Sequence, residues 1–262
     1  MVPELSAIVP FALVVIVAVY FHTVTGFGLA MIIMGLASGA GIASVATLAN
    51  VVGIDTLMNS AFALRGNLHH LPWPVAGVMM TAVLPASVLG VVLLNYLSSV
   101  AADLIQVLLG LVIAYGGLSF AWRPSTLQTV SGRGSFAYYG FLGGLIGGMF
   151  GIPGPPLIFQ LYRQPMSLAQ IRGVLIFLNA VIAAARTGFV AAQGQLYAQE
   201  IMLSAICLPL VALATVAGRR YPPSFSPLTM RRIASVLLVV MGLTLIGPVF
   251  HELEVCTYGA CD

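Results

Sequence analysis

Long apolar runs limit the fold of this chain more than any other feature of its sequence. An α-helix rises about 1.5 Å per residue, so about 20 apolar residues are needed to cross roughly 30 Å of hydrocarbon. Six runs are this long, or nearly so, and they lie at 43–64, 74–95, 101–121, 168–192, 196–218 and 229–249. Only 6% of the 262 residues are charged, whereas soluble domains carry about 25%. We therefore expect an all-α polytopic membrane protein that crosses the lipid bilayer several times.

Two further apolar stretches, 5–39 and 136–163, are interrupted by glycine and proline. The first contains Thr25-Gly26-Phe27-Gly28, and the second contains Phe150-Gly151-Ile152-Pro153-Gly154-Pro155-Pro156. Glycine tolerates backbone conformations outside the helix, and proline prevents a helix from continuing. Each stretch is therefore predicted to be a broken-helix hairpin. Within a membrane, such backbone occurs only where it faces protein or a cavity.

The basic residues, which are all arginine, predict the orientation of the chain. Short arginine-rich loops stay in the cytoplasm, which places the loops around residues 65, 123–133 and 219–232 on that side. Counting spans from these loops makes the two hairpins enter from opposite faces of the membrane. We thus expect two inverted-topology repeats, each a hairpin followed by three transmembrane helices. If each broken stretch instead crosses the membrane once, the repeats are parallel. The expected units are a first repeat at 1–121, a cytoplasmic linker at 122–135, a second repeat at 136–250 and an extracytoplasmic tail at 251–262.

The two breaks form the predicted binding site for a small anion. A helix that restarts after a break presents free N–H groups and the positive end of its dipole, which suit an anion without any lysine. Matched discontinuous helices in two repeats mark the substrate site of secondary transporters. The alternative is that the glycines only allow close packing of helices. The residues predicted to bind substrate at the breaks are Gly26, Phe27, Gly28, Gly151, Pro153, Gly154 and Pro155.

Five polar residues of the spans complete the predicted site. A charge inside the bilayer is costly and is usually paired or functional. Arg172 and Arg186 are predicted to compensate the charge of the anion, with Asn50 and Asn179 as neutral hydrogen-bond donors. Alternatively, Arg172 is an anchor at the cytoplasmic face, Arg186 pairs with Asp55, and each asparagine bonds a neighbouring helix. Asp55 is either such a counter-charge or a group that couples proton movement to transport.

The sequence carries no motif for catalysis, for a metal site or for a cofactor, and no basic patch for nucleic acid. We therefore expect no enzyme, no cofactor and no nucleic-acid partner. The preferred interpretation is a secondary transporter that works by alternating access. Two alternatives are an anion channel and a non-transporting membrane enzyme or accessory subunit. A homodimer is an open alternative to a single chain.

The second break and the helix after it also carry a family resemblance. The segment 140–157 is rich in glycine and ends in Gly-Pro-Pro-Leu, and Gln170-Ile-Arg-Gly-Val174, Asn179 and Arg186 follow it. These motifs, together with Gly26-Phe-Gly28, resemble the sulfite exporter and sulfonate permease family (TauE/SafE, 4-toluene sulfonate uptake permease-like) over about residues 7–250. The resemblance implies a transporter in the cell inner membrane. Its substrate would be a small sulfur-containing anion, either an organosulfonate or a sulfite- or thiosulfate-like ion.

Overall fold

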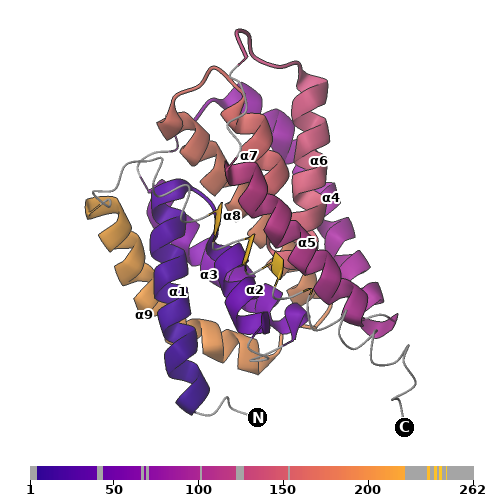
Figure 1. Ribbon diagram of the computed structural model, residues 1–262, viewed down its shortest axis with the longest axis vertical. Coiled ribbons are helices and arrows are strands. Elements are labelled where there is room, and N and C mark those ends of the chain that lie inside the picture. The colour runs from indigo at the N-terminus through magenta and orange to yellow at the C-terminus, as the bar shows by residue number, and fades with distance from the viewer. Residues whose placement is uncertain are drawn as a thin grey trace.

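The computed structural model describes residues 5–39, 44–65, 68, 71–100, 102–121, 127–152 and 154–221, together with 235, 236, 239, 240, 242, 243 and 246. Most of the expected span 229–249, and all of the expected tail 251–262, lie outside the described residues. The described chain is largely helical (Figure 1). Its helices are α1 (Leu5–Thr25), α2 (Leu29–Gly39), α3 (Val45–Leu64), α4 (Trp73–Val100), α5 (Ala102–Ala121), α6 (Arg133–Phe150), α7 (Gly154–Tyr162), α8 (Leu168–Ala192) and α9 (Ala198–Arg220).

Several of these helices suit a bilayer by length and composition. Among the described helices, α3, α4, α8 and α9 are long and apolar enough to cross a membrane, and α1, α2 and α5 contain shorter apolar stretches. Large apolar side chains are exposed on the outside of the molecule, among them Leu13, Val17, Leu111 and Leu213. Such a surface suits contact with lipid rather than water. The structure is that of an all-α polytopic membrane protein, as expected from the sequence.

Each interrupted stretch forms two helices separated at glycine. Between α1 and α2, Gly26 and Gly28 have positive φ angles of +90° and +99°. After α6, Gly151 has a φ of +69°, and its N–H bonds the carbonyl oxygen of Gly147 at 2.8 Å. Residues with a Cβ atom are strained in this region, so glycine is what lets the chain leave each helix. In Figure 1 the α1–α2 pair lies towards the lower part of the molecule and the α6–α7 pair towards the upper part.

Helices from the two halves of the chain pack on each other. α4 packs along α6, α1 packs along α9, and α3 lies against both α8 and α9, while α4 also contacts α8. Glycines allow the close approach of α6 to α4. A Cβ added at Gly144 would lie 2.7 Å from the Val83 carbonyl oxygen, and one added at Gly140 would lie 3.0 Å from that of Met79. The halves therefore share their core instead of folding as separate units.

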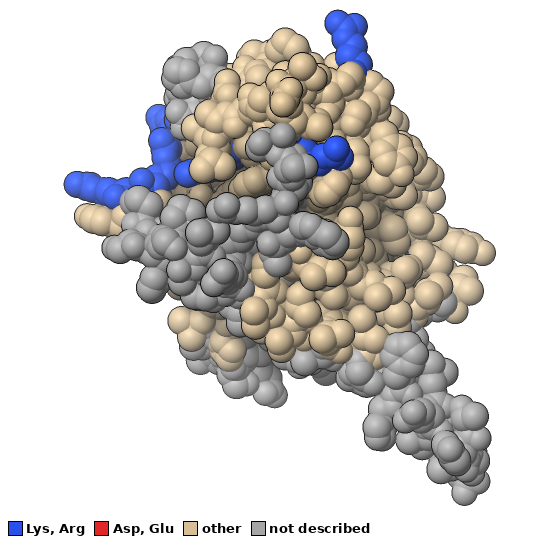
Figure 2. Space-filling view, turned by 45° about the horizontal axis from the view of Figure 1, so that its top comes forward, with Lys and Arg blue, Asp and Glu red and all other residues tan. Residues whose placement is uncertain are grey.

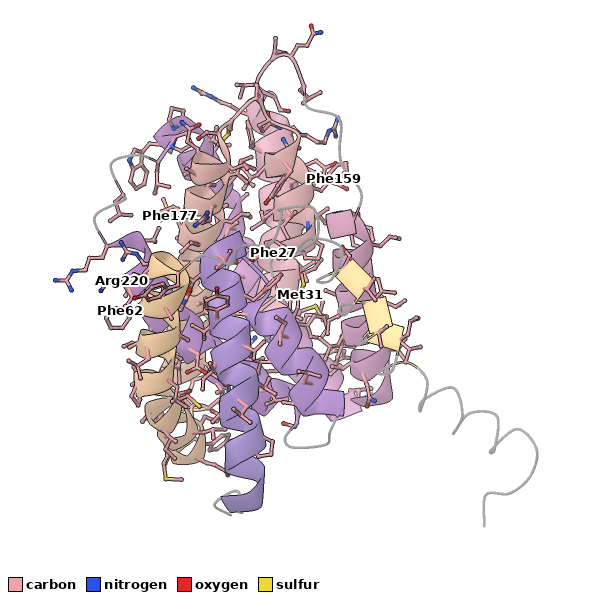
Figure 3. All side chains as sticks on the ribbon, turned by 60° about the vertical axis from the view of Figure 1, so that its left-hand side comes forward. Phe27, Met31, Phe62, Phe159, Phe177 and Arg220 are labelled. Carbon is pink, nitrogen blue, oxygen red and sulfur yellow. The ribbon has the colours of Figure 1, made fainter. Side chains whose placement is uncertain are left out.

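Arginine side chains gather at one end of the molecule (Figure 2). Arg219 joins two helix ends there, since its Nη1 donates to the Phe62 carbonyl oxygen at 2.7 Å. Arg220 projects outward from the end of α9 (Figure 3). The positive-inside rule assigns an end of this kind to the cytoplasm. The arginines that stand at or near helix termini are Arg65, Arg133, Arg163, Arg172, Arg219 and Arg220.

Candidate functional site

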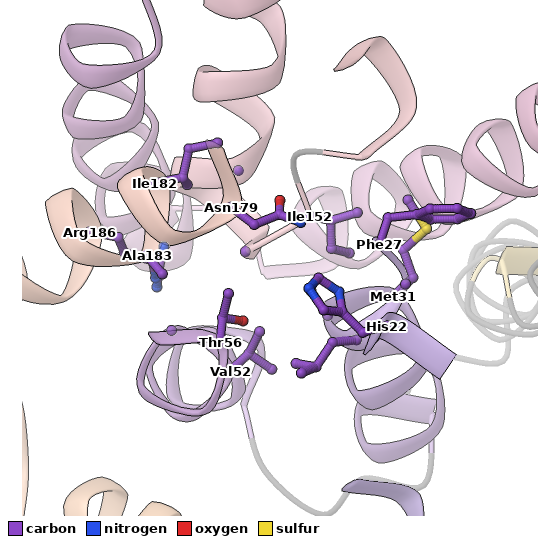
Figure 4. A pocket seen from close by; sticks show the side chains of 16 residues that line it. His22, Phe27, Met31, Val52, Thr56, Ile152, Asn179, Ile182, Ala183 and Arg186 are labelled. Atoms are coloured by element: carbon purple, nitrogen blue, oxygen red, sulfur yellow. The ribbon is translucent and has the colours of Figure 1, made fainter. Parts of the chain in front are cut away.

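A cavity lies where the two breaks approach α3 and α8 (Figure 4). Its lining comes from residues within 27–31 at the first break, 147–152 at the second, 52–56 of α3 and 179–186 of α8, together with His22. The cavity is tight, because the centre of a water molecule can reach only about 20 Å³ of it. That is room for one or two water molecules. The structure thus brings both breaks to a single space.

The start of α2 offers backbone N–H groups to this cavity. Gly28, Leu29, Ala30 and Met31 all line it. The first hydrogen bond of the helix runs from the Ile32 N–H to the Gly28 carbonyl oxygen at 3.0 Å. The three N–H groups before Ile32 therefore have no acceptor within the helix. Together with the positive end of the helix dipole, they favour a negatively charged group.

Arg186 is buried at the cavity wall and binds the end of α6. Its Nη1 donates to the carbonyl oxygens of Gly148 and Met149, which a continuous helix would have bonded itself. Its Nε donates to the Ala49 carbonyl oxygen at 3.2 Å, and its Nη2 donates to Asn50 Oδ1 at 3.0 Å. A guanidinium group carries five N–H groups, so the protein already uses most of them. The positive charge remains at the wall of the cavity.

Asn50 and Glu200 extend this network away from the cavity. Asn50 Nδ2 donates to Glu200 Oε1 at 3.0 Å, so the amide links the carboxylate to Arg186. Glu200 is buried at the start of α9, where its Oε2 accepts the Tyr197 N–H at 3.1 Å. This carboxylate offsets part of the arginine charge. Arg186 does not pair with Asp55, whose carboxylate oxygens have no hydrogen-bond partner in the part of the chain that the structure describes.

Two buried polar side chains face the cavity with unused hydrogen-bonding atoms (Figure 4). Neither ring nitrogen of His22 has a hydrogen-bond partner among the described residues. Asn179 Nδ2 donates to the Gly26 carbonyl oxygen at 3.3 Å, and the Asn179 Oδ1 has no partner in the same set of residues. Unpaired polar atoms are costly inside a protein. These atoms are therefore the ones that a polar solute in the cavity would bind.

The structure gathers much of the predicted site in one place. Gly26 and Asn50 stand directly behind the cavity wall, as hydrogen-bond partners of Asn179 and Arg186. Pro153 lies outside the described residues. The predicted residues that line the cavity are Phe27, Gly28, Gly151, Asn179 and Arg186.

Other predicted residues lie away from the cavity lining. Arg172 is exposed near the start of α8, although a Cβ added at Gly26 would lie only 2.9 Å from its Cγ. Gly154 and Pro155 begin α7 and are not among the described lining residues. Asp55 is buried on a different side of α3, where it interacts electrostatically with Cys207 of α9.

Sequence reasoning missed His22 and Glu200 as parts of this site. His22 stands one turn before the first break, where its carbonyl oxygen accepts the Gly26 N–H at 2.6 Å. That position was the available signal, but a single histidine in an apolar run is more often an ordinary core residue. Glu200 follows Tyr197 at the spacing of an acid that caps a helix start. The spacing predicts a cap and carries no information on burial.

Comparison with known proteins shows the family of this chain. A family model described as "Sulfite exporter TauE/SafE" matches residues 11–245. A "Probable sulfite/organosulfonate exporter TauE" of Cupriavidus necator is 53% identical over 229 residues, which cover 87% of this chain and 90% of that protein. A "Probable inner membrane transporter protein TsaS" of Comamonas testosteroni is 27% identical over 185 residues, which cover 68% of this chain and 74% of that protein. No solved structure matches the chain significantly. The chain therefore belongs to the sulfite exporter TauE/SafE family, whose members are membrane transporters rather than enzymes.

Proposed function

We propose that this protein is a secondary transporter that moves a small sulfur-containing anion across the inner membrane. The anion would be an organosulfonate or a sulfite- or thiosulfate-like ion. The relative from C. necator is named for sulfite and organosulfonate export, and the relative from C. testosteroni for transport at the inner membrane. The observation that carries the proposal is the cavity, whose lining combines the first N–H groups of α2, an arginine and polar side chains that have no partner among the described residues.

The lining suits the oxygens of a sulfonate or sulfite group. These oxygens carry negative charge and accept hydrogen bonds, which the first N–H groups of α2 can donate. Arg186 adds positive charge, and neutral His22 can donate from one ring nitrogen. No aspartate or glutamate is among the described residues that line the cavity. An anion there would meet no like charge directly, since Glu200 lies behind Asn50.

We further propose that residues 1–121 and 136–250 are inverted repeats. The pattern of helix contacts supports this relation, in which α1, α3 and α4 correspond to α6, α8 and α9. Under this correspondence, the contact between α1 and α9 matches the contact between α6 and α4. Likewise, the contact between α3 and α9 matches the contact between α8 and α4. The structure contains all four contacts. The opposite placement of the two hairpins fits the same relation (Figure 1). Inverted repeats allow one site to open to either side of the membrane in turn.

Alternating access would require the hairpins to move relative to α3 and α8. The cavity admits little more than water, and a sulfonate group is several atoms larger. Binding would therefore separate the breaks slightly from these helices. The contacts that cross the moving boundary include the bond from Asn179 to the first break and the bonds from Arg186 to the end of α6. A cavity this tight favours a carrier over a permanently open channel.

Thermal-shift measurements in detergent test the substrate class. The panel contains sulfite, thiosulfate, sulfate, taurine, isethionate and sulfoacetate, with sodium chloride and a neutral sugar as controls. We expect at least one sulfur oxyanion to raise the unfolding midpoint, since a ligand at 100 times its Kd stabilises a protein by about 2.7 kcal/mol. Stabilisation by a cation or neutral solute, with none by any sulfur anion, would contradict the assignment.

Counterflow in proteoliposomes then separates a transporter from a channel. Vesicles preloaded with the unlabelled anion should take up the labelled anion faster than empty vesicles, and the rate should saturate. These properties follow from a site that faces one side at a time. An ionic current that passes without saturation or acceleration would identify a channel instead.

A further inference from the structure

A second group of buried polar side chains lies on the side of α3 that faces α1 and α9. Asp55 is 0% exposed, and neither of its carboxylate oxygens has a hydrogen-bond partner among the described residues. The next residue, Thr56, lines the cavity. α3 therefore carries the cavity on one side and, on another, a carboxyl group that has no hydrogen-bond partner in the described part of the chain.

The amide group of Asn59, close to Asp55 on α3, already uses both of its N–H donors. Asn59 lies one turn further along the same face of α3, and its Nδ2 donates to Thr23 Oγ1 at 3.0 Å and to Thr215 Oγ1 at 2.8 Å. Both threonine hydroxyls donate in turn to carbonyl oxygens of their own helices, at 2.8 and 2.7 Å. Asn59 Oδ1 has no partner in the described part of the chain either. Three buried acceptor oxygens, two of Asp55 and one of Asn59, thus have no donor among the residues that the structure describes.

A proton on Asp55 reduces this imbalance. An ionised carboxylate here would be an unpaired charge in the membrane interior, which is strongly unfavourable. A neutral carboxyl group instead supplies one O–H donor, and Asn59 Oδ1 is an acceptor on the same helix face. We propose that Asp55 is a proton-binding site and that its protonation and deprotonation accompany anion transport. This inference rests on the transport function proposed above.

Among the described residues, the groups around Asp55 offer no counter-charge for its ionised form. From α9, Cys207 is near enough for an electrostatic interaction, but a thiol is neutral in an apolar core. On α1, His22 lies on the cavity wall. Arg186 of α8 and Glu200 of α9 are linked to each other through Asn50, so each already offsets part of the other's charge. The described residues of α2 and α4 include no charged side chain.

The hydrogen bonds of Asn59 also indicate how the proton could be released. They tie α1, α3 and α9 together at one point. Separation of these helices would admit water, and the O–H bond of Asp55 would then break with transfer of the proton to that water. Closure would restore the neutral carboxyl group. Because α1 leads into the first break and α3 lines the cavity, the same movement would change the anion site.

Infrared spectroscopy on the purified protein tests the protonation directly. A neutral carboxyl group has a C=O stretching band that shifts in D2O, and we expect Asp55→Asn to lose one such band at neutral pH. The control is Ser60→Ala, which removes a buried hydroxyl group with no partner among the described residues from the same helix but no titratable group. This control should keep the band. A carboxyl region that is identical in the wild type and in Asp55→Asn would overturn the inference.

Transport in proteoliposomes tests the coupling. The probe is labelled isethionate, or thiosulfate if isethionate does not exchange, because both stay ionised near neutral pH and any proton movement then comes from the protein. With the membrane potential clamped at zero, a gradient of one pH unit can drive up to about a tenfold concentration ratio of a monovalent anion moving with one proton. We expect the wild type and Ser60→Ala to build up a concentration ratio of the labelled anion across the membrane and to change the luminal pH. Asp55→Asn should keep counterflow but lose both effects.

The outcomes separate this inference from the proposed function. No counterflow of any sulfur anion by the wild type would overturn the proposed transport function. Two outcomes would overturn the role of Asp55 and leave the transport function standing. One is counterflow without proton movement, and the other is a pH-driven concentration ratio of the anion that persists in Asp55→Asn. Accumulation driven by a sodium gradient, with no effect of pH, would likewise exclude a coupling proton.

Discussion

Arg186 both stabilises the protein and lines the cavity. Its hydrogen bonds to Gly148 and Met149 bind carbonyl oxygens that the break in α6 leaves free. The link through Asn50 to Glu200 means that its charge is partly compensated before any solute arrives. In the proposed function, the attraction for an anion therefore depends on the start of α2 as well as on this arginine. Removing the side chain should affect folding and binding together.

Two arginine substitutions separate these contributions. Arg186→Ala should lower the free energy of unfolding by about 2 kcal/mol or more, because it leaves several buried oxygens without donors. Arg186→Lys should unfold less readily than Arg186→Ala but bind the anion more weakly than the wild type, since an ammonium group cannot reproduce the planar fork of the guanidinium group.

Arg172→Ala is the matched control, with an exposed side chain. It should change stability by no more than about 0.5 kcal/mol, and if Arg172 attracts the anion, the half-saturating concentration should rise most at low salt. Unfolding midpoints and uptake rates measure both effects, and equal stability of all three variants would contradict the role given to Arg186.

Some site residues could be found from the sequence and others could not. A charge in the middle of an apolar run singles out Arg186, and its spacing from Asn179 puts both on α8. Its partners are not predictable in this way, because they lie more than 35 positions away in the chain. An ion pair with Asp55 was a reasonable alternative from charge alone. The structure shows instead that Asn50 stands between Arg186 and Glu200.

Among the elements, the breaks were the most predictable and the helix pairing the least. Gly26, Gly28 and Gly151 mark the breaks in the sequence because a positive φ angle favours glycine. The pairing of α4 with α6 depends on which glycines meet a neighbouring backbone. Almost every helix of this chain contains small residues, so composition does not identify the helix that packs against α6. The distances in the structure identify it as α4, because an added Cβ at Gly144 would meet the backbone of Val83.

The α4–α6 contact gives a prediction at the scale of elements. Gly144→Ala would place a Cβ 2.7 Å from the Val83 carbonyl oxygen, so the helices must separate, at a cost of about 1–3 kcal/mol. Gly134→Ala on the same helix is the control, because nothing lies within 4 Å of the added atom. Unfolding midpoints in detergent should fall for Gly144→Ala and stay unchanged or rise slightly for Gly134→Ala. A fall of equal size in both variants would show that the helix tolerates no added methyl group anywhere and that the contact has no special role.

In the whole molecule, the two halves interleave but do not carry the same chemistry. Contacts between helices repeat under exchange of the halves, whereas the buried charges do not. Asp55 lies on α3 and Arg186 on α8, and they face different surroundings. In our proposal, the contacts that repeat supply a movement that opens the site to both sides in turn. The buried charges, which do not repeat, give the cavity its preference for an anion and add a proton-binding site beside it.

The orientation of the whole molecule can be checked with single cysteines at its two ends. Gly134 stands at the start of α6 at the arginine-rich end, and Ala192 closes α8 at the opposite end, and both are exposed. In a variant with Cys207, Cys256 and Cys261 replaced by serine, a membrane-impermeant maleimide should label Ala192→Cys in intact spheroplasts. It should label Gly134→Cys only in inside-out vesicles, because arginine-rich ends are retained in the cytoplasm. The reverse pattern would invert the assigned orientation. Labelling of both cysteines from one side would mean that α6 and α8 do not start at the same face of the membrane. That result would also contradict the proposed inverted repeats.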